Sequence, residues 1–325
     1  MRRALVCGGG GFIGAHLVRR LRREGYFVRA ADLRHPEFCE SEADEFVVGD
    51  LRDRSFAQDV VDGGFDELYQ LAAEMGGAGY LFTGDNDVAV MSSVLVNHHV
   101  LEACGRGGVG SVFFSSSACV YPVHNQLDPD ASDCQEDTVY PAAPDSEYGW
   151  EKLFSERLYL TYLRNLGINV HIARYHNIFG PEGTWTGGRE KAPAAICRKV
   201  AEARDGDAIE IWGDGLQTRT FLYVDDCLEA TTRLARSREP GPLNVGSEEL
   251  VSIAGLVDLV ADIAGKRIEK RSVPGPTGVR GRRSDNRRIA ERLDWRPTVP
   301  LRAGLERTYA WIEGQVAATE PVPAA

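Results

Sequence analysis

The heptapeptide Gly8-Gly9-Gly10-Gly11-Phe12-Ile13-Gly14 decides the fold of this chain. Residues 4–7 before it read as a short buried strand, and the apolar spacing of residues 12–23 predicts a helix after it. A strand, a glycine turn and a helix in this order are typical of the unit that holds a dinucleotide pyrophosphate. Gly8 would permit the tight turn, Gly11 would let phosphate oxygens approach helix amides, and Gly14 would let the helix pack on the strand.

The second predicted strand, residues 28–31, leads directly to Asp32. An acidic side chain at this point accepts hydrogen bonds from ribose hydroxyls and repels a 2′-phosphate, so it favours NAD over NADP. Arg34 lies close by and could instead accommodate that phosphate. We expect the remaining cofactor contacts at the helix start and after later strands, from Phe12, Ile13, Asp50, Leu51, Leu71, Ala72 and Ala73.

The rest of the first half alternates in pattern between strands and helices. Alternation of this kind predicts an α/β protein with a doubly wound parallel Rossmann sheet. The further strands are expected at residues 46–48, 67–73, 111–115 and 169–173, and the further helices at 88–104 and 148–166.

The amino-acid composition of the chain changes after about Pro181. Glycine, proline and charged residues become frequent at 183–192 and at 274–285, which predicts loops of a smaller lobe that closes over a ligand. We expect residues 1–178 to form an NAD-binding Rossmann domain, to which 221–246 returns. Residues 179–220 and 247–316 would form a smaller C-terminal α/β substrate lobe, and 317–325 a disordered tail.

Composition limits the partners and the compartment. The net charge of −11, from 37 basic and 48 acidic residues, argues against nucleic acid, which needs a basic face. No apolar run approaches the roughly 18 residues that a membrane span needs, and no signal peptide is recognised. The seven cysteines are scattered without a CxxC pair, so we expect a cytoplasmic protein with no metal site.

Tyr148 and Lys152 are four residues apart on a predicted helix and therefore share one face. A tyrosine is a poor base at neutral pH, with an unperturbed pKa of about 10. A neighbouring ammonium and a positive nicotinamide ring would favour the phenolate, which could then take a proton from a hydroxyl as hydride leaves carbon. Ser117, at the end of a serine-rich strand, would hydrogen-bond the reacting oxygen.

Together, the glycine turn, Asp32, the serine-rich strand end and the Tyr148/Lys152 pair resemble the extended short-chain dehydrogenase/reductase superfamily. Within it, the chain resembles the GDP-mannose 3,5-epimerases of the NAD-dependent epimerase/dehydratase family from residue 1 to about 313. It departs from them in the all-glycine turn at 8–11 and at 122–139, which borders the sugar site. The segments that carry the narrower resemblance are 71–79, 116–122, 174–181, 183–195, 212–219 and 274–281.

The resemblance implies a mechanism in which NAD is reduced and then regenerated. Hydride leaves C4 of the hexose, the resulting ketone acidifies the C–H bonds at C3 and C5, and C4 is reduced again at the end. In the family an acid/base pair of one cysteine and one lysine inverts C3 and C5, and these match Cys119 and Lys191 here. GDP-mannose would thus give GDP-L-galactose or GDP-L-gulose.

The resemblance also points to the residues that hold the nucleotide-sugar. Arginine forks match phosphate oxygens, and a glycine lets backbone approach the hexose. Arg280 sits among Arg282 and Arg283, and a merely solvated basic run is the alternative interpretation of this residue. A homodimer formed through the helices at 88–104 and 148–166 is a family-level expectation. The expected substrate contacts are Gly77, Ser117, Cys119, Asn177, Lys191, Lys199, Gln217, Arg219 and Arg280.

Several related functions stay open at the level of the sequence. A 4,6-dehydratase would be expected to carry acidic residues after Ser117, where Ala118 and Cys119 stand here. A 4-epimerase would leave Cys119 idle, and a non-catalytic dinucleotide sensor would need none of the four proton-handling side chains. The same epimerase chemistry on another nucleotide-linked hexose or heptose is a further alternative.

Overall fold

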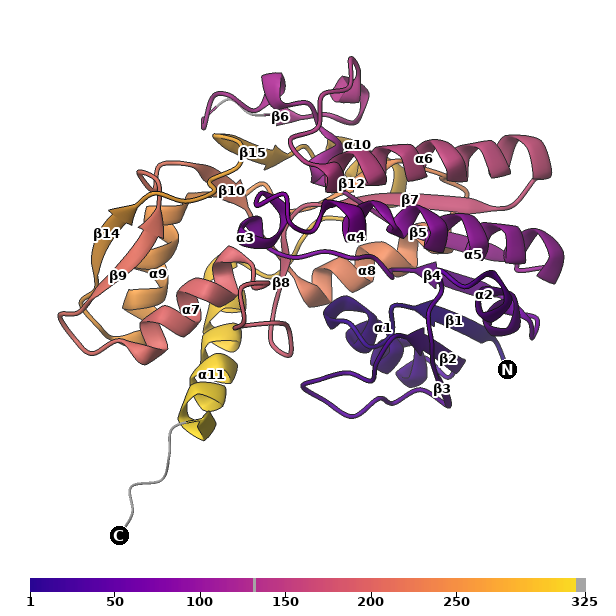
Figure 1. The fold of residues 1–325 in the computed structure, drawn as a ribbon, viewed down its shortest axis with the longest axis horizontal. Coiled ribbons are helices and arrows are strands. Elements are labelled where there is room, and N and C mark those ends of the chain that lie inside the picture. The colour runs from indigo at the N-terminus through magenta and orange to yellow at the C-terminus, as the bar shows by residue number, and fades with distance from the viewer. Residues whose placement is uncertain (131–132, 320–325) are drawn as a thin grey trace, which may run out of the picture.

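A computed structural model describes residues 1–130 and 133–319 of the chain. Its centre is a seven-stranded sheet in the order β12-β7-β5-β4-β1-β2-β3, in which every neighbouring pair is parallel. The sequence-based prediction of a doubly wound parallel sheet is therefore confirmed (Figure 1). The strands are β1 (Arg3–Cys7), β2 (Phe27–Asp32), β3 (Glu45–Val48), β4 (Glu67–Gln70), β5 (Ser111–Ser117), β7 (Val170–Tyr175) and β12 (Leu243–Val245).

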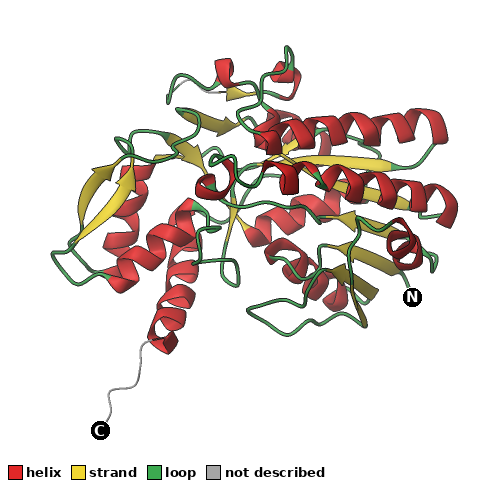
Figure 2. Cartoon of the chain, viewed as in Figure 1, coloured by secondary structure: helices red, strands yellow, loops and turns green. Residues whose placement is uncertain are grey.

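Helices cover both faces of this sheet (Figure 2). Successive side chains of a strand point to opposite faces, so Val6 packs on one side and Leu5 on the other, in two separate hydrophobic clusters. The cluster of Val6 includes α1 (Phe12–Arg23) and α8 (Val224–Ala235). The cluster of Leu5 includes α2 (Arg54–Val61), α5 (Ser93–Gly107) and α6 (Glu147–Leu166).

Two predicted elements differ in extent. The helix expected at 88–104 is divided at Ser92 into α4 (Asp87–Met91) and α5, because the Ser92 hydroxyl donates to the Ala89 carbonyl at 2.6 Å and competes with the helix bonds. The strand expected at 67–73 ends at Gln70. The side-chain amide of Gln70 bonds the backbone of Ala72, at 2.9 and 3.2 Å, in place of a neighbouring strand.

A second group of elements lies to the left of the main sheet in Figure 1. Three helices pack on one another there, α7 (Ala192–Glu202), α9 (Ile253–Ala264) and α11 (Leu301–Thr319). Strand β9 (Ala208–Trp212) pairs with β14 (Glu269–Val273), and β8 (Ile178–Phe179) with β11 (Leu222–Tyr223). A four-stranded sheet has the order β13 (Leu250–Ser252), β10 (Thr218–Thr220), β15 (Gly281–Ser284), β6 (Asp133–Cys134). The remaining helices are α3 (Ala78–Leu81), α10 (Arg287–Leu293) and three short 3-10 helices, η1 (Ala118–Val120), η2 (Val123–Asn125) and η3 (Glu136–Val139).

The chain returns to the main sheet late in the sequence, since β12 is its outermost strand beside β7. The proposed division into two lobes with these boundaries stays a prediction. The expectation of a disordered tail from 317 is wrong for residues 317–319, because α11 runs to Thr319 and the nearby Val316 is buried. Residues 320–325 lie outside the described part.

Within the described residues, no helix combines the length and apolar character that crossing a bilayer requires.

Candidate active site

The glycine turn between β1 and α1 forms the first part of the site. Gly8 has a φ of +85°, and a Cβ there would lie 2.7 Å from the backbone nitrogen of Ala72. A Cβ at Gly14 would lie 2.0 Å from the Gly8 carbonyl oxygen, so only glycine lets α1 begin this close to β1. Gly11 is the N-cap of α1, and no cap side chain bonds the first-turn amides, those of Phe12 and Ile13 among them. These amides are open to an anion such as a pyrophosphate.

Asp32 lies at the end of β2 and faces the same turn. Its carboxylate accepts a hydrogen bond from the Gly10 amide at 3.0 Å, while burial raises the pKa of the carboxyl above its usual value. An acidic acceptor beside an open helix N-terminus fits the ribose and pyrophosphate of a dinucleotide. A hollow lies over the turn, and its lining is Gly10, Gly11, Phe12, Ala15, Arg34, Pro36, Glu37, Phe38, Cys39, Glu182 and Thr184.

The other residues predicted to contact the cofactor follow two strands of the main sheet: Asp50 and Leu51 follow β3, and residues 71–73 follow β4. Leu51 is buried, whereas the Asp50 carboxylate is held by the guanidinium of Arg52 at 2.7 Å. Leu71, Ala72 and Ala73 follow β4 and lie beside Gly8, with the Leu71 amide bonded to the Cys7 carbonyl at 2.9 Å. Their contacts with a cofactor stay predictions.

Replacing Gly8 by alanine is expected to remove NAD binding. Gly25 is the matched control, because its φ is +83° but nothing lies within 4 Å of its Cβ. Gly8→Ala and Gly25→Ala should each lose about 1–2 kcal/mol of unfolding free energy through backbone strain. Only Gly25→Ala should keep the stabilisation by NAD, measured as thermal unfolding with and without it. Equal stabilisation of both variants would contradict this location for the pyrophosphate.

Tyr148 and Lys152 lie on one face of α6, next to the end of β5. The Lys152 Nζ is 5.5 Å from the centre of the Tyr148 ring and 4.9 Å from that of Phe114. Burial lowers the pKa of the Lys152 amine. Burial also raises the pKa of the Tyr148 phenol well above its usual value, against which a hydrogen bond with Ser117 acts. The structure thus brings Tyr148, Lys152 and Ser117 together. Without bound cofactor or substrate, the Tyr148 phenol is protonated.

The groups that hold Lys152 were missed by the sequence analysis. The Glu151 Oε2 lies 3.7 Å from the Lys152 Nζ. The other oxygen of Glu151 accepts hydrogen bonds from Asn97 Nδ2 at 2.9 Å and from Ser155 Oγ at 2.8 Å. All four side chains are buried, so the orientation of the carboxylate is fixed. Neighbouring residues of a helix do not face each other, so the sequence gives no signal for a Glu151–Lys152 pair.

Cys119 lies in the short helix η1, directly after β5. Its amide donates to the Ser117 Oγ at 3.2 Å, which fixes the turn. A Cβ at Gly149 would lie 2.2 Å from the Cys119 carbonyl oxygen, so the first turn of α6 packs directly against this turn and brings Tyr148 close. The Arg282 guanidinium donates to the Cys119 Sγ at 3.2 Å.

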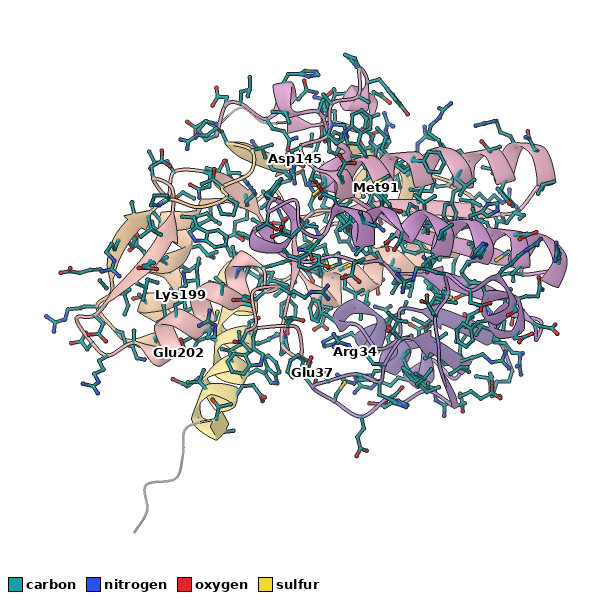
Figure 3. All side chains as sticks on the ribbon, in the orientation of Figure 1. Arg34, Glu37, Met91, Asp145, Lys199 and Glu202 are labelled. Atoms are coloured by element: carbon teal, nitrogen blue, oxygen red, sulfur yellow. The ribbon has the colours of Figure 1, made fainter. Side chains whose placement is uncertain are left out.

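Arg282, to which the sequence analysis gave no role, is therefore part of the site. It is 5% exposed, and it also binds Asp145 at 3.0 Å and Gln126 at 2.6 Å. Figure 3 labels Asp145 close to the start of α6. Arg280, the residue predicted instead, is much more exposed and pairs with Asp214 at 3.0 Å. Arg282 lies within β15, which is flanked by β10 and β6, whereas Arg280 precedes the strand.

Lys191 ends a glycine-bearing loop and is the N-cap residue of α7. Burial lowers the pKa of its amine. Gly77 supports the approach of this loop. Its amide donates to the Arg189 carbonyl at 2.9 Å, and a Cβ there would lie 2.2 Å from the Glu190 carbonyl oxygen.

Two further predicted substrate residues are bonded to the backbone of the protein. Asn177 has a φ of +48°, and its Nδ2 donates to the Thr220 carbonyl at 3.0 Å. The Lys199 Nζ donates to the Glu210 carbonyl at 2.7 Å. Figure 3 labels Lys199 on α7, well away from Asp145. Substrate contacts of both residues stay predictions.

Gln217 and Arg219 each have a polar group that can still bind a ligand. Gln217 donates to the Trp212 carbonyl at 3.0 Å, and its buried Oε1 has no partner among the described residues. Arg219 donates only to backbone carbonyls, those of Thr218 at 2.7 Å and Thr277 at 3.0 Å. Burial lowers the pKa of the Arg219 guanidinium to about 10. A guanidinium with carbonyl partners alone keeps its positive charge for an anion.

The site as a whole combines a dinucleotide cradle with several proton-handling groups. The phenol of Tyr148, the amine of Lys152 and the thiol of Cys119 are gathered at the carboxyl end of β5, and the loop that ends at Lys191 packs on Gly77, after the neighbouring strand β4. Such a set can take a proton from a hydroxyl and exchange protons on carbon, which are the steps that a bound sugar would require.

Comparisons with known proteins agree with this chemistry. Residues 4–246 match the family described as NAD dependent epimerase/dehydratase family. The chain is 42% identical over 313 residues to GDP-mannose 3,5-epimerase from Arabidopsis thaliana, which covers 96% of this chain and 82% of the relative. It is also 42% identical to GDP-mannose 3,5-epimerase 1 of Oryza sativa subsp. japonica, over 97% of this chain and 82% of that one. The UDP-glucose 4-epimerase of Thermus thermophilus, solved in complex with NAD, has a TM-score of 0.82 at 25% identity, over 96% of this chain and 99% of that one.

Proposed function

Because this chain belongs to the NAD-dependent epimerase/dehydratase family, we propose that it is a nucleotide-sugar 3,5-epimerase that acts on GDP-mannose. One observation carries the proposal. Cys119 follows β5 and packs against the first turn of α6, which carries Tyr148, and the loop that ends at Lys191 packs on Gly77, after the neighbouring strand β4. A redox enzyme that only oxidises and reduces C4 needs no such second acid/base pair.

NAD is the cofactor of this family, and when bound it accepts a hydride from C4 of the sugar and returns it. Tyr148 takes the proton of the C4 hydroxyl as the hydride leaves, and Ser117 holds the same oxygen. Lys152, kept in place by Glu151, lies under the tyrosine ring and supplies the positive charge that favours the phenolate. A ketone at C4 then makes the hydrogens on C3 and C5 acidic.

Cys119 and Lys191 remove and return those hydrogens as protons. Inversion at each carbon requires one group to take the proton from one face of the ring and the other to deliver a proton to the opposite face. Arg282 supports this step, because its guanidinium stabilises the negative charge that develops on the Cys119 sulfur. Tyr148 finally gives its proton back to the C4 oxygen as the hydride returns.

The substrate follows from the relatives that share 42% of the sequence, both named GDP-mannose 3,5-epimerases. The guanidinium of Arg219, free of any carboxylate partner among the described residues, suits the diphosphate, and the unpartnered Gln217 Oε1 suits a donor on the base or the sugar. The products would be GDP-L-galactose and GDP-L-gulose. The same chemistry on another nucleotide-linked hexose or heptose is the alternative.

The proposal is tested by incubating the protein with GDP-mannose and NAD in deuterated water and following the mass and configuration of the sugar. Incorporation of deuterium at C3 and C5 with inversion is the expected result. A persistent 4-keto-6-deoxy product would instead identify a dehydratase, and inversion at C4 without exchange a 4-epimerase. Binding of NAD without turnover of GDP-mannose or other nucleotide-sugars would favour a sensor.

We also propose that the enzyme is a homodimer formed through α4, α5 and α6. Met91 and Leu95 are four residues apart, as are Trp150 and Phe154, and all four are exposed apolar side chains on helices that pack side by side. Figure 3 labels Met91 in this region.

The absence of disulfides among the seven cysteines supports a reducing, cytoplasmic location.

The variant Leu95→Glu/Phe154→Glu is therefore expected to be a monomer. Two charges would be buried without partners in the proposed interface, so dimerisation should weaken by at least about a hundredfold. Light scattering coupled to size-exclusion chromatography measures the mass. Leu216→Glu, at an equally exposed apolar residue of the other lobe, is the control and should remain dimeric. A wild-type protein that is a monomer at micromolar concentration would refute the dimer.

A further inference from the structure

The loop that carries Lys191 is held down by a cluster of three side chains, Glu74, Tyr80 and Arg189. The Arg189 guanidinium forms an ion pair with the Glu74 Oε1, and it lies 4.2 Å from the centre of the Tyr80 ring. The Tyr80 hydroxyl donates to the same Glu74 oxygen at 2.6 Å. Each member therefore contacts both others, which makes the cluster cooperative.

The cluster joins two parts of the active site that are far apart in sequence. Glu74 follows the residues after β4 that lie beside Gly8, and its amide bonds the Ser93 hydroxyl at 3.0 Å, so it is anchored on the side of the cofactor cradle. Arg189 is two residues before Lys191, in the loop that ends at α7. A change in the distance between Glu74 and Arg189 therefore moves Lys191 relative to the cradle.

The backbone around the loop has the properties of a hinge. Gly187 and Gly188 both have a φ of +87°, a conformation that glycine adopts without strain. On the far side, Glu190 is fixed by the Gly188 amide at 2.7 Å and by the Arg198 guanidinium at 3.2 Å. Rotation at the two glycines is then opposed chiefly by the contacts of Arg189 and by the bond from Gly77 to its carbonyl at 2.9 Å.

We propose that Glu74, Tyr80 and Arg189 form a latch that closes this loop and sets the position of the Lys191 amine over the sugar. The three are positioning residues, and the role of Lys191 on which the latch depends is that of the proposed function. The side chains of Glu74 and Arg189 are 28% and 41% exposed, so water and salt reach the ion pair. A pair of this exposure is weak enough to open for the entry of substrate and the exit of product.

The latch is tested with Glu74→Gln, which keeps the shape and the acceptor for Tyr80 but removes the charge, and with Tyr80→Phe, which removes the hydroxyl. The first readout needs no substrate. Trypsin cleavage after Arg189 or Lys191 requires the loop to open, and it should be about five- to tenfold faster in Glu74→Gln and less accelerated in Tyr80→Phe. Asp262→Asn, which removes an exposed ion pair with Arg302 of 2.7 Å elsewhere, is the matched control and should be cleaved as the wild type.

The second readout separates a positioning role from a structural one. Lys191→Met measures how far deuterium exchange at C3 and C5 depends on Lys191. In Glu74→Gln the exchange that depends on Lys191 should fall about tenfold, whereas oxidation at C4 stays within twofold of the wild type. Loss of C4 oxidation together with the exchange, or unchanged cleavage and exchange, would overturn the latch. If the wild type shows no exchange at either carbon, the proposed function fails instead, and the cleavage rates alone decide whether the latch holds the loop.

Discussion

Tyr148→Phe is expected to lower the turnover of GDP-mannose by about 10²–10⁴-fold, the usual contribution of a positioned general acid/base. The phenol is buried at the end of β5 beside Ser117 and Lys152, and no other described group takes its place next to them. Because the ketone at C4 must form before C3 and C5 become acidic, the same variant should also lose deuterium exchange at both carbons.

Single-turnover absorbance of reduced NAD measures the first step of this variant, and mass spectrometry measures the exchange. Tyr162→Phe, on the same helix but away from the site, is the control and should be unaffected. Phenylalanine fills the same space, so the melting temperature of Tyr148→Phe should match that of the wild type. Exchange that persists in Tyr148→Phe would remove this residue from the oxidation step.

Cys119→Ala and Lys191→Met are expected to separate the two halves of the reaction. Both variants leave Tyr148, Lys152 and the glycine turn intact, so reduction of NAD by the sugar should continue. Each should lose proton exchange at C3 and C5, because inversion at each carbon needs both groups, and epimerisation should fall by about 10²–10⁴-fold. The result would be a 4-keto sugar that returns to GDP-mannose without inversion.

The comparison depends on following both ring carbons separately, by the position of deuterium in the recovered sugar. Lys270→Met is the control for the loss of a lysine, because Lys270 of β14 forms a surface ion pair with Asp258 of α9. If either Cys119→Ala or Lys191→Met exchanges both carbons at the wild-type rate, the acid/base role of that residue is wrong. If both lose C4 oxidation as well, the site depends on them for its structure.

Features that depend on a few neighbouring residues were predicted well from the sequence. The glycines at 8 and 14 mark the turn because a positive φ at Gly8 and the close approach of backbone at both positions exclude other residues there. The spacing of Tyr148 and Lys152 gave their common face, because the period of an α-helix is fixed. Even the limits of the helix after the turn were predicted, at 12–23.

Features that depend on contacts between distant parts of the chain were not predicted from the sequence. Arg282 and Arg280 differ by two positions, yet only Arg282 contacts Cys119, because β15 is inserted between β10 and β6. The bond from Lys199 to the Glu210 carbonyl, which a strand brings to it, had no signal in the sequence, and a contact of Lys199 with the substrate stays a prediction. Asp145, Gln126 and Glu151 escaped notice, since an isolated acid or amide in a sequence carries no sign of burial.

The sequence by itself therefore determined the sheet, the glycine turn and the common helix face of Tyr148 and Lys152. These follow from backbone sterics and from the periods of helix and strand, which act over a few residues. The tertiary structure decided which charges are neutralised inside the protein and which remain for a ligand, and how the loop of Lys191 is held by Glu74 and Tyr80. Those outcomes depend on burial and on contacts between segments far apart in the chain, and neither is encoded in local spacing.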